Sequence, residues 1–97
     1  MKLQQIHLKV SGRVQGVGFR QSTLIEAQKL QLVGSVRNTE DGSVEIMAEG
    51  ATHDIERLRE WCHLGPVHAR VEKVDLIRLT EIQMLTATNF IIHVGQE

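Results

Sequence analysis

Several residue types that often carry function are scarce or absent in this chain. Its 97 residues include no tyrosine, two phenylalanines and one tryptophan. RNA-binding modules that stack bases on a sheet need aromatic side chains on the central strands. Here Phe19 precedes an expected helix and Trp61 lies within another. The scarcity of aromatic residues therefore argues against an RNA-binding sheet.

Cysteine and long apolar runs are also lacking. Cys62 is the only cysteine, so no internal disulfide can form, which is compatible with a reducing compartment. No run approaches the roughly 20 apolar residues that a membrane-spanning helix needs. The first six residues turn directly into a strand pattern without the apolar core of a signal peptide. We therefore expect a cytoplasmic protein with no membrane partner.

No excess of charge of one sign is present. The chain has 11 basic and 12 acidic residues, a net charge of −1, and its basic residues do not cluster. A nucleic-acid-binding protein is expected to show a basic face, so we expect no nucleic-acid partner. The apolar content of 41% and charged content of 24% are typical of a folded soluble protein. We expect a single domain over residues 1–97, and a monomer.

The most informative stretch runs from Val10 to Arg20, where an alternating run gives way to a helical pattern. Gly12, Gly16 and Gly18 let the backbone turn tightly and approach a ligand. Backbone amides can then converge, together with the free donors of a helix N-terminus, on an anion. Arg20 adds a planar fork of donors that fits two phosphate oxygens. The stretch predicts a phosphate-binding loop between a strand and a helix.

A phosphate-binding loop is not the only interpretation of this stretch. The glycines could merely shape a turn, with Arg20 as a solvated surface charge. Two better-known phosphate loops do not match, because Gln21 stands where a dinucleotide fingerprint has its third glycine and no Gly-Lys-Ser/Thr follows. Spacing alone leaves the choice open.

The remaining elements follow from periodicity. A helix is expected over about 21–31, because apolar residues there recur at spacings of three and four. Strands are expected over 32–38 and 44–50, joined in a hairpin by a turn with Gly42 at its tip. A second helix is expected from an N-cap at Thr52 to Gly65-Pro66, with Cys62 as a small core residue on its apolar face.

The last third of the chain is less regular. A strand is expected from Ala69 to Leu79, but its apolar phase shifts between Val71 and Val74, which indicates either a bulge or an irregular crossover. Residues 80–89 are expected to be a connection and residues 90–94 a short strand. The order predicts an α+β fold, a two-layer α/β sandwich of the ferredoxin-like kind, βαββαβ plus a short terminal strand. Its sheet should be largely antiparallel and packed by two helices.

Metal and nucleophile chemistry find little support. Cys62, His63 and His68 are close in sequence, but they straddle a helix end and a Gly-Pro turn and lack a recognised zinc spacing. No serine or cysteine has an evident base partner. We expect no metal site and no cofactor.

Two ordered motifs resemble those of the acylphosphatase family. The stretch from Val10 to Arg20 resembles its first signature, and the stretch from Gly34 to Val44, with Gly50 further on, resembles its second. The chain departs from the family pattern at Ser35, where an aromatic residue is usual, and at Gln31, where a glycine is common. The lost glycine predicts a less sharply defined helix end.

The resemblance implies an enzyme that hydrolyses the carboxyl–phosphate bond of acyl phosphates, without a metal, to a carboxylate and inorganic phosphate. It implies catalytic roles for Arg20 and Asn38, with Asn38 positioning the attacking water if the second strand lies near the first. The phosphate is expected to bind backbone amides of Gln15, Gly16, Val17, Gly18, Phe19 and Arg20. Gln15 is expected to contribute its backbone rather than its side chain. The alternative is a non-catalytic module of the same fold that binds phosphate or carbamoyl phosphate, and Asn38 alone could equally be a turn-capping residue.

Overall fold

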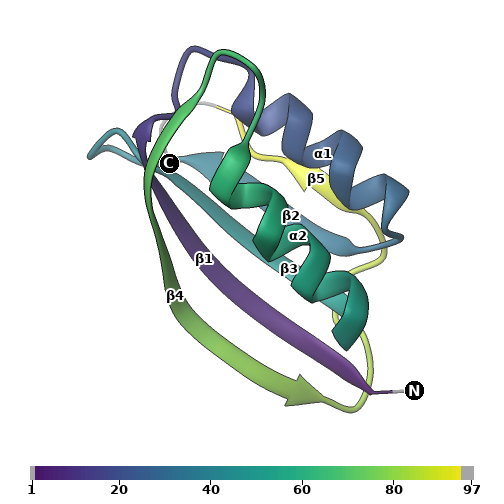
Figure 1. Cartoon of the computed structure of the whole chain (residues 1–97). Coiled ribbons are helices and arrows are strands. Elements are labelled where there is room, and N and C mark those ends of the chain that lie inside the picture. The colour runs from purple at the N-terminus through teal and green to yellow at the C-terminus, as the bar shows by residue number, and fades with distance from the viewer. Residues whose placement is uncertain (1, 95–97) are drawn as a thin grey trace.

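The computed structural model describes residues 2–94, in which two helices cover one face of a five-stranded sheet (Figure 1). The elements in chain order are β1 (Leu3–Arg13), α1 (Phe19–Lys29), β2 (Val33–Asn38), β3 (Val44–Ala51), α2 (Thr52–Leu64), β4 (Arg70–Ile82) and β5 (Phe90–Ile92). The strands lie in the order β4-β1-β3-β2-β5, and only the β2–β5 pair is parallel. The predicted ferredoxin-like sandwich with its terminal strand is confirmed.

The sequence analysis made the role of Asn38 conditional on β2 lying near β1; in the structure the two strands are not adjacent, because β3 lies between them. The hydrophobic pattern cannot reveal this, since β2 and β3 pair with each other in either arrangement. The register nevertheless puts Val10, Val44 and Asn38 in one row across the sheet. Asn38 therefore lies two strands from Val10, near the end of β1 that leads into the loop.

The core forms between the sheet and the helices. Alternate residues of β1, namely Ile6, Leu8 and Val10, are buried beneath them. The predicted apolar faces of both helices are confirmed, and Cys62 is fully buried on α2. Burial, with Glu26 adding a smaller effect, raises the pKa of the Cys62 thiol to about 12, so this side chain remains a neutral core residue.

Two of the helix ends that were predicted from capping residues differ in the structure, whereas α2 ends at Leu64 with Gly65 as its C-cap, as predicted. Gln31 adopts a left-handed conformation with φ of 58°. Its N–H donates to the Gln28 carbonyl (3.1 Å), and the N–H of Leu32 donates to the Ala27 carbonyl (2.9 Å). These are the two bonds of a Schellman motif, so the prediction of a poorly defined end is wrong.

The predicted N-cap of α2 is wrong by one residue. Ala51 occupies that position and Thr52 is the first helical residue. The Thr52 hydroxyl is buried and has no hydrogen-bond partner among residues 2–94.

No helix in the described part of the chain is both long and apolar enough to cross a bilayer.

The phase shift in β4 is a bulge rather than an irregular crossover. The β1–β4 register skips Glu72 opposite the Ser11–Gly12 step and skips Ile77 in a second irregularity. Gly12, with φ of 126°, packs against this region, and a Cβ there would lie 2.3 Å from the Arg70 carbonyl oxygen. Gly12 therefore serves the sheet rather than the ligand loop. β4 also runs three residues beyond its predicted end, to Ile82, and β5 ends at Ile92 rather than at residue 94.

Candidate active site

The loop between β1 and α1 has the backbone of an anion site. Gly16 and Gly18 have φ of 77° and 80°, and a Cβ added at either would meet no heavy atom of the described chain within 4 Å. Gly18 is the N-cap of α1, and the first helical bond of this turn runs from the Ser22 N–H to the Gly18 carbonyl (3.0 Å). The amides that precede Ser22 have no acceptor within the helix, and such amides bind anions.

The side chain of Gln15 has a structural role that the sequence did not predict. Its Nε2 donates to the carbonyl oxygens of Thr39 (2.9 Å) and Ser43 (2.8 Å). These carbonyls belong to the turn between β2 and β3, which begins directly after Asn38. The expectation that Gln15 contributes only its backbone is therefore incomplete, because its side chain ties the loop to the strand end that carries Asn38.

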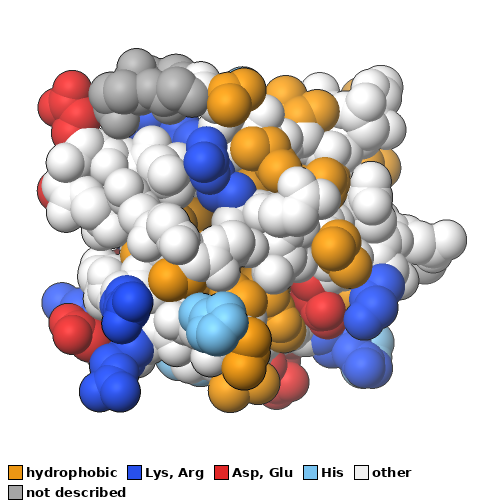
Figure 2. Space-filling view, turned by 90° about the horizontal axis from the view of Figure 1, so that it is seen from above, with side chains coloured by type: hydrophobic (Ala, Val, Ile, Leu, Met, Phe, Trp, Pro, Cys, Tyr) orange, Lys and Arg blue, Asp and Glu red, His pale blue; other side chains and the backbone are white. Residues whose placement is uncertain are grey.

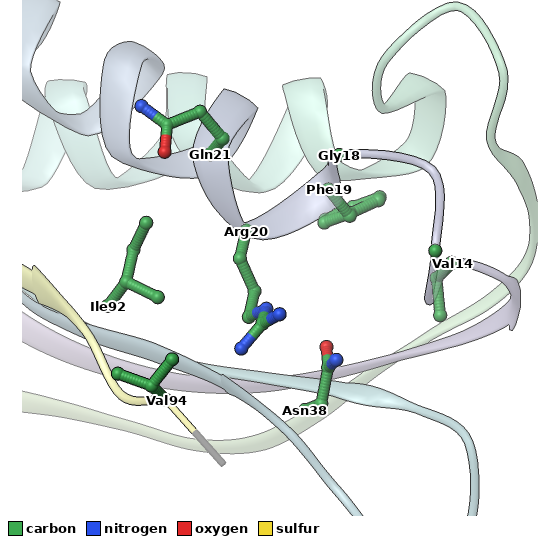
Figure 3. Close-up of a pocket in the computed structure, with 9 residues that line it drawn as sticks. Val14, Gly18, Phe19, Arg20, Gln21, Asn38, Ile92 and Val94 are labelled. Atoms are coloured by element: carbon green, nitrogen blue, oxygen red, sulfur yellow. The ribbon is translucent and has the colours of Figure 1, made fainter.

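A pocket of about 240 Å³ opens in front of this loop (Figure 3). It is lined by Val14, Gly16, Gly18, Phe19, Arg20, Gln21, Asn38, Ile92 and Val94. The side chains of Arg20, from α1, and Asn38, from the end of β2, point into the same space (Figure 3). The two residues that the sequence singled out are therefore brought together, although Gln15 and Val17 do not line the pocket.

Arg20 is held from the far end of the chain. Its Nη1 donates to the carbonyl oxygen of His93 at 3.2 Å. Ile92 and Val94, on either side of His93, form an apolar wall of the pocket. None of these three residues was predicted to belong to the site, because neither of the two motifs extends to the last strand.

The first residue of α1 anchors the loop in the core. Phe19 is only 1% exposed, and its ring lies 5.4 Å from that of Trp61, between centroids, at 55°. The start of α1 is thus fixed by packing, which gives the loop amides a stable orientation. Trp61 and Phe19 serve packing, as their sequence context indicates.

Charge around the site is mixed. On the face that is seen from above in Figure 2, basic side chains are dispersed and interleaved with acidic ones.

Arg37, next to Asn38 in sequence, lies on the face of the sheet away from the helices, where its Nε donates a hydrogen bond to Glu45 at 2.7 Å. Burial alone raises the pKa of Glu45, but hydrogen bonds from His7 and Arg37 lower it overall. Within residues 2–94, no three His, Cys, Asp or Glu side chains form a possible metal-ligand group.

The sequence model of the acylphosphatase family matches residues 6–92. The chain belongs to the acylphosphatase family. An acylphosphatase of Marinobacter nauticus is 48% identical over 86 residues, which cover 89% of this chain and 94% of that protein. An acylphosphatase structure from Coxiella burnetii superposes with a TM-score of 0.84 at 39% identity, covering 95% and 94% of the two chains.

The same fold also occurs inside a larger protein. The structure of full-length HypF in its phosphate- and nucleotide-bound form contains a region with a TM-score of 0.80 and 31% identity, which covers 99% of this chain but 12% of that one. The predicted acylphosphatase membership is confirmed, and with it the reaction class, hydrolysis of the carboxyl–phosphate bond. The candidate active-site pocket is formed by the β1–α1 loop with the start of α1, the end of β2, and residues at and just after the end of β5.

Proposed function

We propose that this enzyme holds the phosphoryl group of an acyl phosphate with the amides of residues 15–20 and the Arg20 guanidinium, while Asn38 positions the attacking water. The observation that supports this most directly is the convergence of Arg20 and Asn38 on one pocket at the N-terminus of α1 (Figure 3).

Phosphate binding follows from charge. A phosphoryl group in transfer spreads negative charge over its three equatorial oxygens. Preorganised amides and a guanidinium directed at these oxygens stabilise that charge without reorganising during the reaction. The hydrogen bond from Arg20 to His93 orients the guanidinium before the substrate arrives. The remaining donors of Arg20 can then bind two phosphate oxygens together.

Asn38 acts on the water. Its amide offers both a donor and an acceptor, so it can orient a water molecule in line with the departing carboxylate. The water oxygen forms a bond to phosphorus while the bond from phosphorus to the acyl oxygen breaks. The carboxylate leaves with the electron pair, and the proton of the water passes to the phosphate product. A carboxylate is a good leaving group, so these residues suffice without a general acid.

The experiment is release of inorganic phosphate from benzoyl phosphate with a metal chelator present. We expect Arg20→Ala to lower turnover by at least about 10²-fold to 10³-fold, the effect of losing one oxyanion donor. Arg20→Lys should restore little, because a point charge does not reproduce the bidentate fork. Arg78→Ala, at an exposed position on β4, is the matched control. Near-normal turnover by Arg20→Ala contradicts the assignment.

For Asn38→Ala we expect kcat to collapse while inorganic phosphate still binds. Normal kcat with lost phosphate affinity would instead make Asn38 a phosphate-binding residue. Calorimetric titration with phosphate, alongside turnover, distinguishes the two.

The second candidate is a non-catalytic module that binds phosphate or carbamoyl phosphate. It is favoured by the resemblance to part of HypF, whose structure is described as phosphate-bound. Absence of phosphate release, together with protection of the protein from heat by phosphate, would support this candidate and contradict catalysis.

A further inference from the structure

The sheet carries a second pocket, of about 290 Å³, on the face opposite the helices. It is lined by Gln5, Gly34, Ser35, Met47, Glu49, Thr86, Ala87, Ile91 and His93. Val36 and Ile46 are buried beneath the helices, and side chains alternate along strands. Ser35 and Met47 therefore point to the other face. Nothing in the acylphosphatase reaction uses this pocket.

The middle of this pocket is a slot with apolar sides. Met47, Ser35 and Ile91 form one row across β3, β2 and β5. The two flanking side chains, Met47 and Ile91, are 36% and 43% exposed, whereas the serine between them is short. Gly34 beside it contributes no side chain. A flat ring fits such a slot, and a methionine sulfur makes favourable contacts with aromatic rings.

The rim of the slot, which Glu49 and Thr86 form, is held in place by hydrogen bonds. The Glu49 carboxylate accepts hydrogen bonds from Gln5 Nε2 (2.6 Å), the Thr86 N–H (2.7 Å) and the Thr86 hydroxyl. These bonds fasten the segment between β4 and β5 to the sheet. Burial alone raises the pKa of Glu49, but these bonds lower it overall, so the group is an anion at neutral pH. A negative carboxylate beside the slot disfavours anionic ligands, and the Ser35 hydroxyl and His93 imidazole can pair with a ring N–H or O–H.

The strand β5 separates this slot from the active-site pocket. Ile91 lines the slot, while its neighbour Ile92 lines the active-site pocket. His93 lines the slot, while its carbonyl oxygen accepts the hydrogen bond from Arg20. A ring that contacts Ile91 and His93 therefore acts on the same backbone that orients the guanidinium.

We propose that this slot is an effector site for a small, neutral aromatic compound with a hydrogen-bonding N–H or O–H, and that its occupancy changes phosphate affinity through β5. The binding of the ring depends on the slot alone. The coupling rests on the proposed role of Arg20 in phosphate binding. Coupling of this kind is reciprocal, so phosphate must change the affinity for the ring by the same factor.

Indole is the probe for binding, measured by calorimetry on the intact protein. We expect saturable binding to the unmodified chain and binding weaker by at least about tenfold in Ser35→Trp, whose own ring fills the slot. By filling the slot, Ser35→Trp should also raise the thermal midpoint. Thr80→Trp, at an exposed position outside the slot, is the control and should bind indole normally.

A second variant, Ile91→Ala, tests the site if Ser35→Trp does not fold. Ile91→Ala removes one side of the slot and should also weaken indole binding. Absence of indole binding by the unmodified chain, or equal binding by the slot variants, overturns the site.

Coupling is tested by titrating inorganic phosphate with and without saturating indole. We expect the phosphate dissociation constant to change by about fivefold, the lower end of usual allosteric couplings. Turnover is followed with acetyl phosphate, which has no ring to enter the slot. An unchanged phosphate affinity with indole bound overturns the coupling. If the proposed active site is wrong, the result is a different one: Arg20→Ala keeps normal turnover, and indole still binds to the slot.

Discussion

The end of α1 contains the one non-glycine residue among residues 2–94 that has a positive φ, Gln31. Replacing it with glycine relieves a left-handed strain of about 1–2 kcal/mol for a residue with a Cβ. The greater freedom of glycine in the unfolded chain offsets about 0.4–1 kcal/mol of that gain. Gln31 is exposed, so its side chain contributes little packing. We expect Gln31→Gly to raise the free energy of unfolding by about 0.5–1 kcal/mol.

The size of the chain converts this gain into a measurable shift. For domains of this length, about 1 kcal/mol corresponds to about 4–8 °C in the thermal midpoint. We therefore expect a rise of about 2–8 °C, measured by calorimetry or by circular dichroism. Turnover should not change, because Gln31 lies at the end of α1 opposite the β1–α1 loop and the candidate active-site pocket.

Gln28→Gly is the matched control, because it removes the same side chain three residues earlier. Gln28 is exposed and lies within the helix, so glycine there should lower stability by about 1 kcal/mol. If Gln31→Gly raises the free energy of unfolding and Gln28→Gly lowers it, the left-handed conformation of Gln31 is the cause. A midpoint that falls in both variants refutes the reasoning.

Two further predictions concern the packing of the fold. Gly65→Ala should lower stability by about 1–3 kcal/mol, because φ there is 69° and the new Cβ would lie 2.7 Å from a ring carbon of Phe19. Gly42→Ala is its control, with φ of 91° but no described atom within 4 Å of the Cβ, and an equal loss in both would remove the steric argument. Glu49→Gln should lower stability at neutral pH, by about 1–3 kcal/mol as its charged hydrogen bonds weaken. Because the pKa of Glu49 is lowered in the folded state, its contribution is complete above the ordinary value of 4.5 and is lost as pH falls through the lowered one. Urea unfolding at neutral and acid pH should therefore show the difference from the unmodified chain shrinking on acidification, and a constant difference would contradict the role of the charge.

Much of the fold could be predicted because its signals are local. The alternation in β1 and the apolar faces of α1 and α2 depend on residues within a few positions of one another. The candidate phosphate loop could be proposed for the same reason, since Gly16, Gly18 and Arg20 lie within five positions. Where local signals compete, the predictions were wrong. Gln31 lies at a sharp helix end although it is not glycine, and Leu32, which completes the Schellman motif, is buried in the core. Burial of Leu32 is a tertiary effect that the preference of a single residue does not contain.

The sequence by itself determined the order of the elements, the α+β class and the presence of Arg20 and Asn38 in two separate motifs. Only the tertiary structure decided that β3 lies between β1 and β2, that Gln15 fastens the loop to the hairpin, and that residues 92–94 lie at the candidate site. The bond from Arg20 to His93 joins residues 73 positions apart. Such contacts depend on which strands pair and in what register, and the free energy that selects a pairing comes from burial across the whole sheet rather than from any single stretch of sequence.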